Sequence, residues 1–298
     1  MGLFELQTYL KDRAALIERA LAATVSQHDG LESRLFEAMR YSLLEGGKRL
    51  RPILALASCE AVGGSRDDAI DYACALEMIH TYSLIHDDLP SMDNDDLRHG
   101  KPTNHKVYGD AIATLAGDAL VTDAFAAVAR TSFARKHPEV VLEVIAELSD
   151  AAGSRGMVSG QVIDLLGEGR TMNLEQLEYL HSKKTGALFH ASVIGGARLG
   201  GATSVQLAAL SKYARALGLC FQVVDDLLDV EASTEQMGKR TNKDEAAGKN
   251  TYPVLMGIEQ SHALARDLES RAQAALSSFD HRAEALRAIA NFVVERKH

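Results

Sequence analysis

Two clusters of aspartates constrain this chain more than any other feature, because each lies at the end of an apolar run with helical spacing. The members of the two clusters are Asp87, Asp88 and Asp93, and Asp225, Asp226 and Asp229. Carboxylates are rarely buried unless they are paired or bind a metal ion. We therefore expect two buried helices to bring the clusters onto facing walls of one site. Oxygen ligands without Cys or His at ligand spacing favour Mg²⁺ over Zn²⁺.

The length and composition are typical of one helical domain. Of the 298 residues, 46% are hydrophobic, 5 are proline and none is tryptophan. No linker divides the chain, so we expect residues 1–298 to form a single domain. Helical periodicity predicts an all-α fold, with helices near 3–27, 32–44, 50–62, 68–88, 105–133, 138–165, 174–199, 204–231, 250–278 and 282–296.

Charge and targeting signals exclude several classes of protein. A net charge of −9 argues against nucleic acid as a partner and requires an anionic substrate to meet local cations or metal ions. The cysteines form no CxxC pair, so we expect buried thiols in a cytoplasmic protein. No signal peptide is apparent and no run approaches transmembrane length, so we expect no integral membrane segment.

The first cluster is interrupted by a proline that should bend the chain back. Pro90 disfavours helix in the preceding residue, so the helix should end near Leu89 and Asp93 can fold back toward Asp87 from a loop. Basic residues follow immediately, at Arg98, His99 and Lys101. An acidic group followed by a basic one suits an anion bridged by metal ions, and diphosphate is the natural candidate.

The second cluster repeats this order on a helix. Asp225 and Asp229 are neighbours on one helical face, where a divalent ion would turn their repulsion into coordination. Gln222 joins the same polar stripe. Basic residues again follow, among them Lys239 and Lys249.

Two further basic segments have both a functional and a purely structural interpretation. Gly46-Gly47-Lys48-Arg49-Leu50-Arg51-Pro52 lies between two predicted helices and could hold a phosphate, although for this segment taken alone a solvated basic turn is the better explanation. Lys183-Lys184-Thr185 falls within a predicted helix, where a surface pair is the alternative. Gly160-Gln161 with Asp164 suggests an inward polar face.

Taken together, six motifs resemble the trans-isoprenyl diphosphate synthases, most closely the bacterial-type farnesyl diphosphate synthases. The motifs are GGKRLRP, IHTYSLIHDDLPSMDNDDLRHGKPT, GQVIDL, KKTGAL, FQVVDDLLD and GKNTYP. The resemblance spans roughly residues 30 to 297 in the family's order. It implies an isoprenoid-synthase-type bundle of about ten or more helices around a central cavity, and a homodimer.

The resemblance also implies a reaction and its cofactor. An allylic diphosphate ionises with the help of Mg²⁺, and the double bond of isopentenyl diphosphate attacks the carbocation. Dimethylallyl and then geranyl diphosphate would be extended to (2E,6E)-farnesyl diphosphate. The family pattern implies a cluster of about three Mg²⁺ ions per active site, with Mn²⁺ able to substitute. A dry, apolar cavity would protect the cation.

The same resemblance assigns roles by position. Both aspartate clusters would bind Mg²⁺, with Asp87, Asp93 and Asp225 as the surest ligands. The allylic diphosphate would meet Arg98, Lys184, Lys239 and Lys249. Isopentenyl diphosphate would meet Gly47, Lys48, Arg51 and His80, with Arg296 and Lys297 closing its site. The oxygens of Thr185 and Gln222, alongside Lys184, would stabilise the cation, and the departing diphosphate would take the proton.

One position departs from the family pattern. The family motif usually reads DDLRRGKPT, and here His99 replaces the second Arg, which contacts isopentenyl diphosphate. Histidine lacks the bidentate fork of arginine. We expect weaker binding of isopentenyl diphosphate, more so at alkaline pH, unless Lys101 or Arg49 compensates.

Product length depends on the residues that precede the first cluster. In relatives these residues form the floor of the cavity, and here they are Ile79, Tyr82 and Ser83. Tyr82 is bulky enough to stop chain growth at C15, although ideal helix geometry places Ser83 nearer the face of Asp87. A geranyl or geranylgeranyl product is the alternative within the family.

Three other functions deserve comparison. His86-Asp87 is also the doublet of HD-type phosphohydrolases, but these need further His ligands. A non-catalytic synthase subunit would have lost an aspartate motif, and both motifs are complete here. A terpene cyclase would share the first cluster but would lack the basic grip of Gly47, Lys48 and Arg51.

Overall fold

The chain forms a bundle of helices with one small hairpin. The computed structural model describes the backbone of residues 4–237 and 250–296, and the side chains of 4–231 and 250–296. The N-terminal half contains α1 (Leu6–Thr24), α2 (Ser33–Leu43), α3 (Leu50–Ala61), α4 (Arg66–Asp87), β1 (Leu97–Arg98), β2 (Lys101–Pro102), α5 (Asn104–Tyr108), α6 (Asp110–Ala129), α7 (Ser132–Lys136) and α8 (Pro138–Ala152). The C-terminal half contains α9 (Met157–Gly167), α10 (Leu174–His181), η1 (Ser182–Gly186), α11 (Ala187–Leu199), α12 (Ser204–Met237), α13 (Tyr252–Met256), α14 (Ile258–Ala275), η2 (His281–Ala283) and α15 (Glu284–Glu295).

The all-α prediction is confirmed, but several expected helices are broken. The expected helix 105–133 is divided into α5 and α6 at Gly109, and 250–278 into α13 and α14 at Gly257. These glycines have φ of 85° and 87°, a left-handed conformation that other residues avoid. The expected helix 138–165 is interrupted between Ala152 and Met157. The capping box at Asn173 and Gln176 is present as expected, and Thr203 and Gln206 exchange the same bonds.

Helix α4 is the centre of the molecule. Every residue from Tyr72 to Ile79 is buried, and Glu77 is the one charged residue among them, as expected of a core helix. Tyr72 donates a hydrogen bond to the carbonyl oxygen of Ala191 in α11, at 2.6 Å. The cysteines are all buried and unpaired, as the sequence predicts: Cys59, Cys74 and Cys220.

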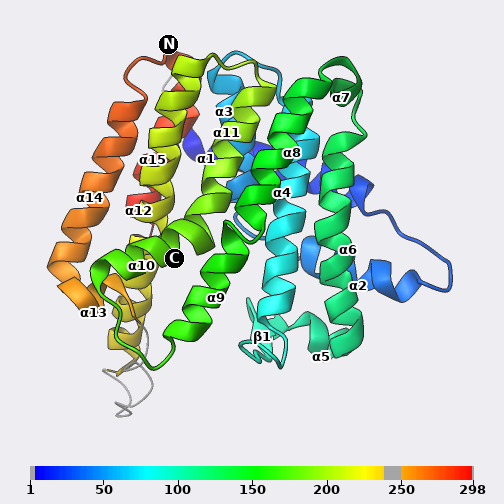
Figure 1. Ribbon diagram of the computed structural model, residues 1–298, viewed down its shortest axis with the longest axis horizontal. Coiled ribbons are helices and arrows are strands. Elements are labelled where there is room, and N and C mark those ends of the chain that lie inside the picture. The colour runs from blue at the N-terminus through cyan, green and yellow to red at the C-terminus, as the bar shows by residue number, and fades with distance from the viewer. Residues whose placement is uncertain (1–3, 238–249, 297–298) are drawn as a thin grey trace.

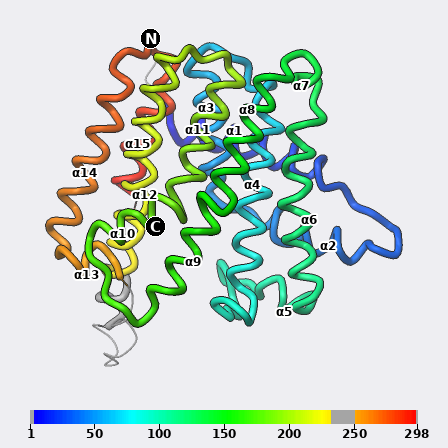
Figure 2. Tube along the Cα trace, in the orientation of Figure 1, coloured from blue at the N-terminus to red at the C-terminus, as the bar shows by residue number. Residues whose placement is uncertain are grey.

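The two helices that carry the aspartates run in the same direction. In Figure 1, α4 and α12 both descend toward the end of the bundle where the hairpin of β1 and β2 lies. The tube in Figure 2 follows the same path, with α9 and α10 at this end as well. The bundle therefore brings the C-terminal ends of two long helices to one end of the molecule, as two facing clusters require.

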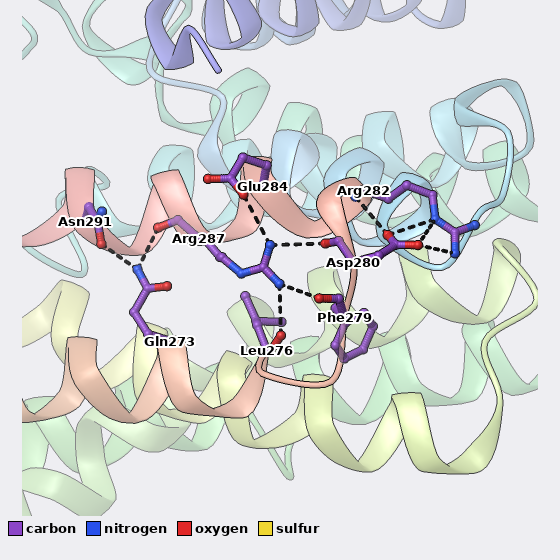
Figure 3. A network of polar contacts seen from close by, with 8 residues as sticks. All are labelled: Gln273, Leu276, Phe279, Asp280, Arg282, Glu284, Arg287 and Asn291. Carbon is purple, nitrogen blue, oxygen red and sulfur yellow. Dashed lines mark hydrogen bonds and ion pairs between the residues drawn. The ribbon is translucent and has the colours of Figure 1, made fainter. Parts of the chain in front are cut away.

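A network around Arg287 holds α15 against the end of α14 (Figure 3). The guanidinium donates to the carbonyl oxygens of Leu276 and Phe279, just beyond the C-terminal end of α14, at 3.0 and 2.7 Å. It also donates to the carbonyl oxygen of Asp280 and the carboxylate of Glu284. This anchoring fixes the course of α15, whose far end carries Arg296 into the site.

Two helices among the described residues are long and apolar enough to cross a membrane, judged by length and composition alone. They are α6, with a mean hydropathy of 1.5, and Ser204–Glu231 of α12, with 1.2. The expectation that no run approaches this length is therefore wrong. Half of the second segment is buried inside the molecule. Core helices of soluble proteins pass the same test, so the finding is weak evidence for a membrane segment.

Candidate active site

The first aspartate cluster folds back on itself as the proline predicts. Helix α4 ends at Asp87, two residues before the predicted Leu89. The backbone N–H of Asp93 then donates to the carbonyl oxygen of Asp87 at 2.9 Å. Asp93 is exposed and Asp87 is half-buried. The loop therefore returns one carboxylate to the helix end that carries the other.

Asp88 is engaged by a cation from the hairpin. Arg98 donates from Nε to both carboxylate oxygens of Asp88 at 3.0 Å, and from Nη2 to Oδ1 at 2.7 Å. The side chain of Asp88 is only 4% exposed. In this arrangement Asp88 holds Arg98 in place at the site. Its expected metal contact, and the contact of Arg98 with diphosphate, stay predictions.

His99, the residue that departs from the family motif, lies in a tight turn. Arg98 and Lys101 pair across the hairpin, so His99 and Gly100 are the two turn residues. Both have positive φ, at 50° and 79°, as a two-residue type I′ turn requires. The two residues that could replace the missing Arg both have acidic partners already. Arg49 is buried against Glu77, and the amine of Lys101 lies 3.4 Å from Glu45.

The second cluster contains one buried and two accessible carboxylates. Asp226 is 6% exposed, and its oxygens accept from Gln222 Nε2 at 2.9 Å and from the backbone N–H of Tyr252 at 3.1 Å. Burial raises the pKa of Asp226 to about 6, against the opposing effect of these two bonds. The side chain of Asp225 is about half exposed, and Asp229 is exposed. Asp226 thus faces the protein, whereas its neighbours face outward.

The three residues expected to stabilise a cation lie close together. Thr185 donates to Gln222 Oε1 at 3.0 Å, and Gln222 in turn donates to Asp226. Lys184 donates to Asp164 of α9 at 2.6 Å, so Asp164 of that segment contacts η1, although its side chain is about half exposed. Both Lys184 and Thr185 lie in η1, a π-helical turn inserted between α10 and α11. Such turns are rare and occur often at functional sites.

Helix α9 approaches the backbone of η1 very closely. A Cβ atom built on Gly160 would lie 2.3 Å from the backbone nitrogen of Lys184 and 2.5 Å from its Cα. Only a residue without a side chain fits at this crossing. Gly160 therefore sets how deeply Lys184 and Thr185 project into the site.

A cavity of about 620 Å³ collects most of the predicted residues. The expected site residues on its wall are Gly47, Lys48, Arg51, His80, Asp88, Arg98, His99, Thr185, Gln222 and Asp225. Arg296 also lies on this wall. Its guanidinium lies 4.0 Å from the ring centre of Phe221 and donates to Asp225 at 3.1 Å.

The basic loop before α3 is held by a partner that sequence reasoning missed. Arg49 has φ of 49° and is buried, donating to Glu77 of α4 at 2.6 Å and to the carbonyl oxygen of Leu43 at 2.8 Å. This clamp fixes the loop that presents Lys48 and Arg51. The simpler interpretation of this segment as a solvated turn is therefore wrong for Arg49. No sequence spacing links Glu77 to Arg49, although Glu77 is a rare acidic residue in an apolar run.

The cavity is crowded with cations that disfavour one another. Burial lowers the pKa of Arg51 to about 10. Burial and then Arg296 lower the pKa of Lys48. Burial, followed by Arg51 and Arg98, holds the pKa of His80 well below its usual range, so this imidazole is neutral. Such crowding inside an acidic protein favours binding of a strongly charged anion.

The carboxylates beside this cavity suit a hard cation. Burial raises the pKa of Asp87 to about 6, Lys184 opposes this shift, and Asp93 adds to it. The repulsion that Asp93 exerts on the Asp87 carboxylate would be relieved by an oxygen-seeking ion such as Mg²⁺. Within the described part of the chain, no three acidic, His or Cys side chains converge on one point. The oxygen donors of the two clusters fit Mg²⁺ chemically, and the sharing of metal ions between the clusters stays a prediction.

Some predicted residues cannot be placed. Lys239, Lys249 and Lys297 lie outside the described residues. Among the described residues, sequence reasoning missed His181 and Tyr252, which contact the second cluster from behind. His181 lies in an ordinary helical pattern, and no local signal marks it.

Comparison with known proteins identifies the family. The polyprenyl synthetase family pattern matches residues 32–289. The chain belongs to the polyprenyl synthetase family. It is 48% identical over 300 residues to the large subunit 1 of a heterodimeric geranylgeranyl pyrophosphate synthase from Arabidopsis thaliana, covering 99% of this chain and 80% of that protein. It is also 48% identical to a dimethylallyltranstransferase from Fischerella ambigua, over 99% of this chain and 85% of that one.

A solved structure of the same family has the same fold. An FPP/GFPP synthase from Zymomonas mobilis superimposes with a TM-score of 0.88 at 41% identity, covering 97% of this chain and 98% of that one. The isoprenoid synthase fold expected from the motifs is thereby confirmed, and the polyprenyl synthetase described here is a prenyltransferase that joins isoprenoid diphosphates.

Proposed function

We propose that this polyprenyl synthetase makes (2E,6E)-farnesyl diphosphate from isopentenyl diphosphate and dimethylallyl diphosphate, through geranyl diphosphate. The observation that carries the C15 product is the position of Tyr82. Its ring packs edge-to-face on His86, with centroids 5.4 Å apart. His86 is fixed in turn by α6, since its Nε2 lies 3.0 Å from the carbonyl oxygen of Thr114. Tyr82 is therefore braced and cannot easily swing away from a growing chain.

The charges of the site support the two substrate positions. The cation-lined cavity of Gly47, Lys48 and Arg51 suits isopentenyl diphosphate, and neutral His80 can donate a hydrogen bond there. The allylic diphosphate lies between the aspartate clusters, within reach of Arg98 and Lys184. Lys239 and Lys249 remain part of this proposal.

The proposed reaction breaks one carbon–oxygen bond and forms one carbon–carbon bond. Asp87, Asp93 and Asp225 would hold Mg²⁺, which supplies positive charge for the departing diphosphate. Thr185 and Gln222 present oxygens toward the allylic cation, and the double bond of isopentenyl diphosphate attacks it. The departing diphosphate then takes the proton lost from the new carbon chain. No side chain needs to act as the base.

A homodimer is the proposed assembly. Helix α6 has a mean hydropathy of 1.5, yet only a third of it is buried within this chain. Leu115 on this helix is 53% exposed. Apolar surface of this kind favours burial against a second copy. A cytoplasmic location stays a prediction.

Geranylgeranyl diphosphate is the second candidate product. The names of several plant relatives at about this identity, including one from Catharanthus roseus at 48%, support it. Product analysis with Mg²⁺, isopentenyl diphosphate and dimethylallyl diphosphate decides between them. A dominant C15 diphosphate supports the proposal, a C20 diphosphate supports the alternative, and no condensation by folded protein rejects both.

A further inference from the structure

Asp226 is the point from which the cation-facing oxygens are oriented. Its Oδ1 accepts from Gln222 Nε2 at 2.9 Å, which turns Gln222 Oε1 toward Thr185. Thr185 then donates its hydroxyl hydrogen to Oε1 at 3.0 Å. The lone pairs of the Thr185 oxygen are left for the cavity that Thr185 lines. Any shift of the Asp226 carboxylate therefore passes through Gln222 to Thr185.

His181 faces this carboxylate without a partner of its own. It is the last residue of α10, immediately before the π-helical turn that carries Thr185. The residue is 8% exposed, and neither ring nitrogen makes a hydrogen bond. Nε2 lies 3.9 Å from Asp226 Oδ2. A buried imidazole without a partner costs free energy, so its position calls for a functional explanation.

The surroundings of His181 leave its ring free to donate a hydrogen bond to Asp226. Its ring packs on Tyr252, with centroids 5.6 Å apart and planes inclined by 31°. The hydroxyl of Tyr252 is likewise buried without a partner. A neutral imidazole carries one N–H, and the nearest carboxylate oxygen to Nε2 is that of Asp226.

We propose that His181 is a positioning residue, whose Nε2–H donates to Asp226 Oδ2 when the site closes on its substrates. A movement of about 1 Å brings the pair to hydrogen-bond distance. With this third donor, the Asp226 carboxylate is held in place, and the chain of hydrogen bonds from Asp226 through Gln222 to Thr185 has a fixed geometry. His181 acts through Asp226 and touches neither substrate. The inference rests on the proposed function in one respect, namely that Thr185 and Gln222 face the allylic cation.

Substitutions that move the donor test this role. Glutamine places an N–H near the position of Nε2, asparagine places one nearer Nδ1, and leucine keeps the bulk without a donor. We expect kcat of His181→Gln within threefold of the wild type, and a loss of at least tenfold in His181→Asn and His181→Leu. The KM for isopentenyl diphosphate should change by less than threefold, because the cations expected to bind its diphosphate, Lys48 and Arg51, belong to the loop before α3 and to α3.

The matched control is His190→Leu. His190 lies on α11, partly buried, with its Nε2 2.9 Å from Ser211 Oγ and away from both aspartate clusters. This variant should keep wild-type kcat. Equal kcat in the glutamine and asparagine variants would overturn the proposal, as would a leucine variant as active as the wild type. If the leucine variant does not fold, the comparison of glutamine with asparagine still decides.

A measurement without turnover separates this inference from the proposed function. In protein labelled with ¹⁵N-histidine, the ring resonances of His181 are assigned by their loss in His181→Gln. We expect the Nε2–H tautomer, and a shift of this resonance in Asp226→Asn. An Nδ1–H tautomer, or a resonance unaffected by Asp226→Asn, contradicts the proposal even if the enzyme condenses its substrates. If condensation fails but this signature is present, the proposed function alone is wrong.

Discussion

Asp226 is a carboxylate whose burial is costly to the free protein. Its folded pKa of about 6 lies above the ordinary value of 3.8. The folded state therefore binds more protons than the unfolded state between these values, and stability falls as pH rises through this range. Above pH 6 the full cost remains. Such a position is kept for what it orients, not for stability.

Replacing Asp226 with Asn should separate stability from activity. We expect the free energy of unfolding at pH 7 to rise by about 1–3 kcal/mol, because a buried charge is removed. The new amide would turn Gln222 over, so kcat should fall at least tenfold. Urea unfolding between pH 4 and 8 and steady-state kinetics measure the two effects. A variant whose stability falls with pH as steeply as that of the wild type contradicts this account.

His99 gives a second prediction at the scale of one side chain. Its turn position accepts Arg, since Arg49 itself adopts φ of 49° in this protein. His99→Arg should lower the KM for isopentenyl diphosphate by roughly three- to tenfold, because a guanidinium binds diphosphate bidentately. Kinetics from pH 6 to 9 should show KM rising with pH in the wild type but not in this variant. An identical, flat KM in wild type and His99→Ala would show that His99 makes no contact.

At the scale of elements, the π-helical turn η1 is the feature that positions the chemistry. Gly160→Ala places a methyl group against the backbone of Lys184 and must push η1 away. We expect kcat to fall at least tenfold and the free energy of unfolding to fall by about 1–3 kcal/mol. Gly186→Ala is the matched control within η1, since its nearest neighbour would lie at 3.4 Å. Equal effects of the two substitutions would argue against the close crossing as the cause.

Sequence reasoning located the helices and their motifs but not the contacts between them. Pro90 and the capping box at Asn173 are local signals. Pro90 correctly predicted that the chain folds back after Asp87, and the capping box correctly predicted the start of a helix. The π-helical turn has no such signal, because it differs from an α-helix by one inserted residue. Partners such as Glu77 and His181 lie far in sequence from the groups they support. Only the packing of the helices brings them together.

For the whole molecule, the exposed apolar face of α6 predicts how the chain assembles. Leu115→Glu should convert a dimer into a monomer, as measured by light scattering during size-exclusion chromatography. Val254→Glu is a suitable control, because Val254 is 62% exposed and belongs to α13, at the opposite side of the bundle in Figure 1. A wild-type chain that is monomeric at micromolar concentration would contradict the proposed assembly.

The site is built from residues that lie in distant parts of the bundle. Cations from the loop before α3, from the hairpin and from the end of α15 surround one cavity, although the molecule as a whole is acidic. The motifs predicted this set of residues. The pairing of Arg296 with Asp225 depends on the course of α15, which the network around Arg287 determines.

The distribution of product chain lengths tests the central claim most directly. Wild-type protein and Tyr82→Ala are incubated with Mg²⁺, isopentenyl diphosphate and dimethylallyl diphosphate, and the products are separated after dephosphorylation. Removing the braced ring should lengthen the cavity, so we expect C15 from the wild type and C20 or longer from the variant. A wild type that already makes C20, or a variant with an unchanged C15 product, would contradict the role of Tyr82 as the floor.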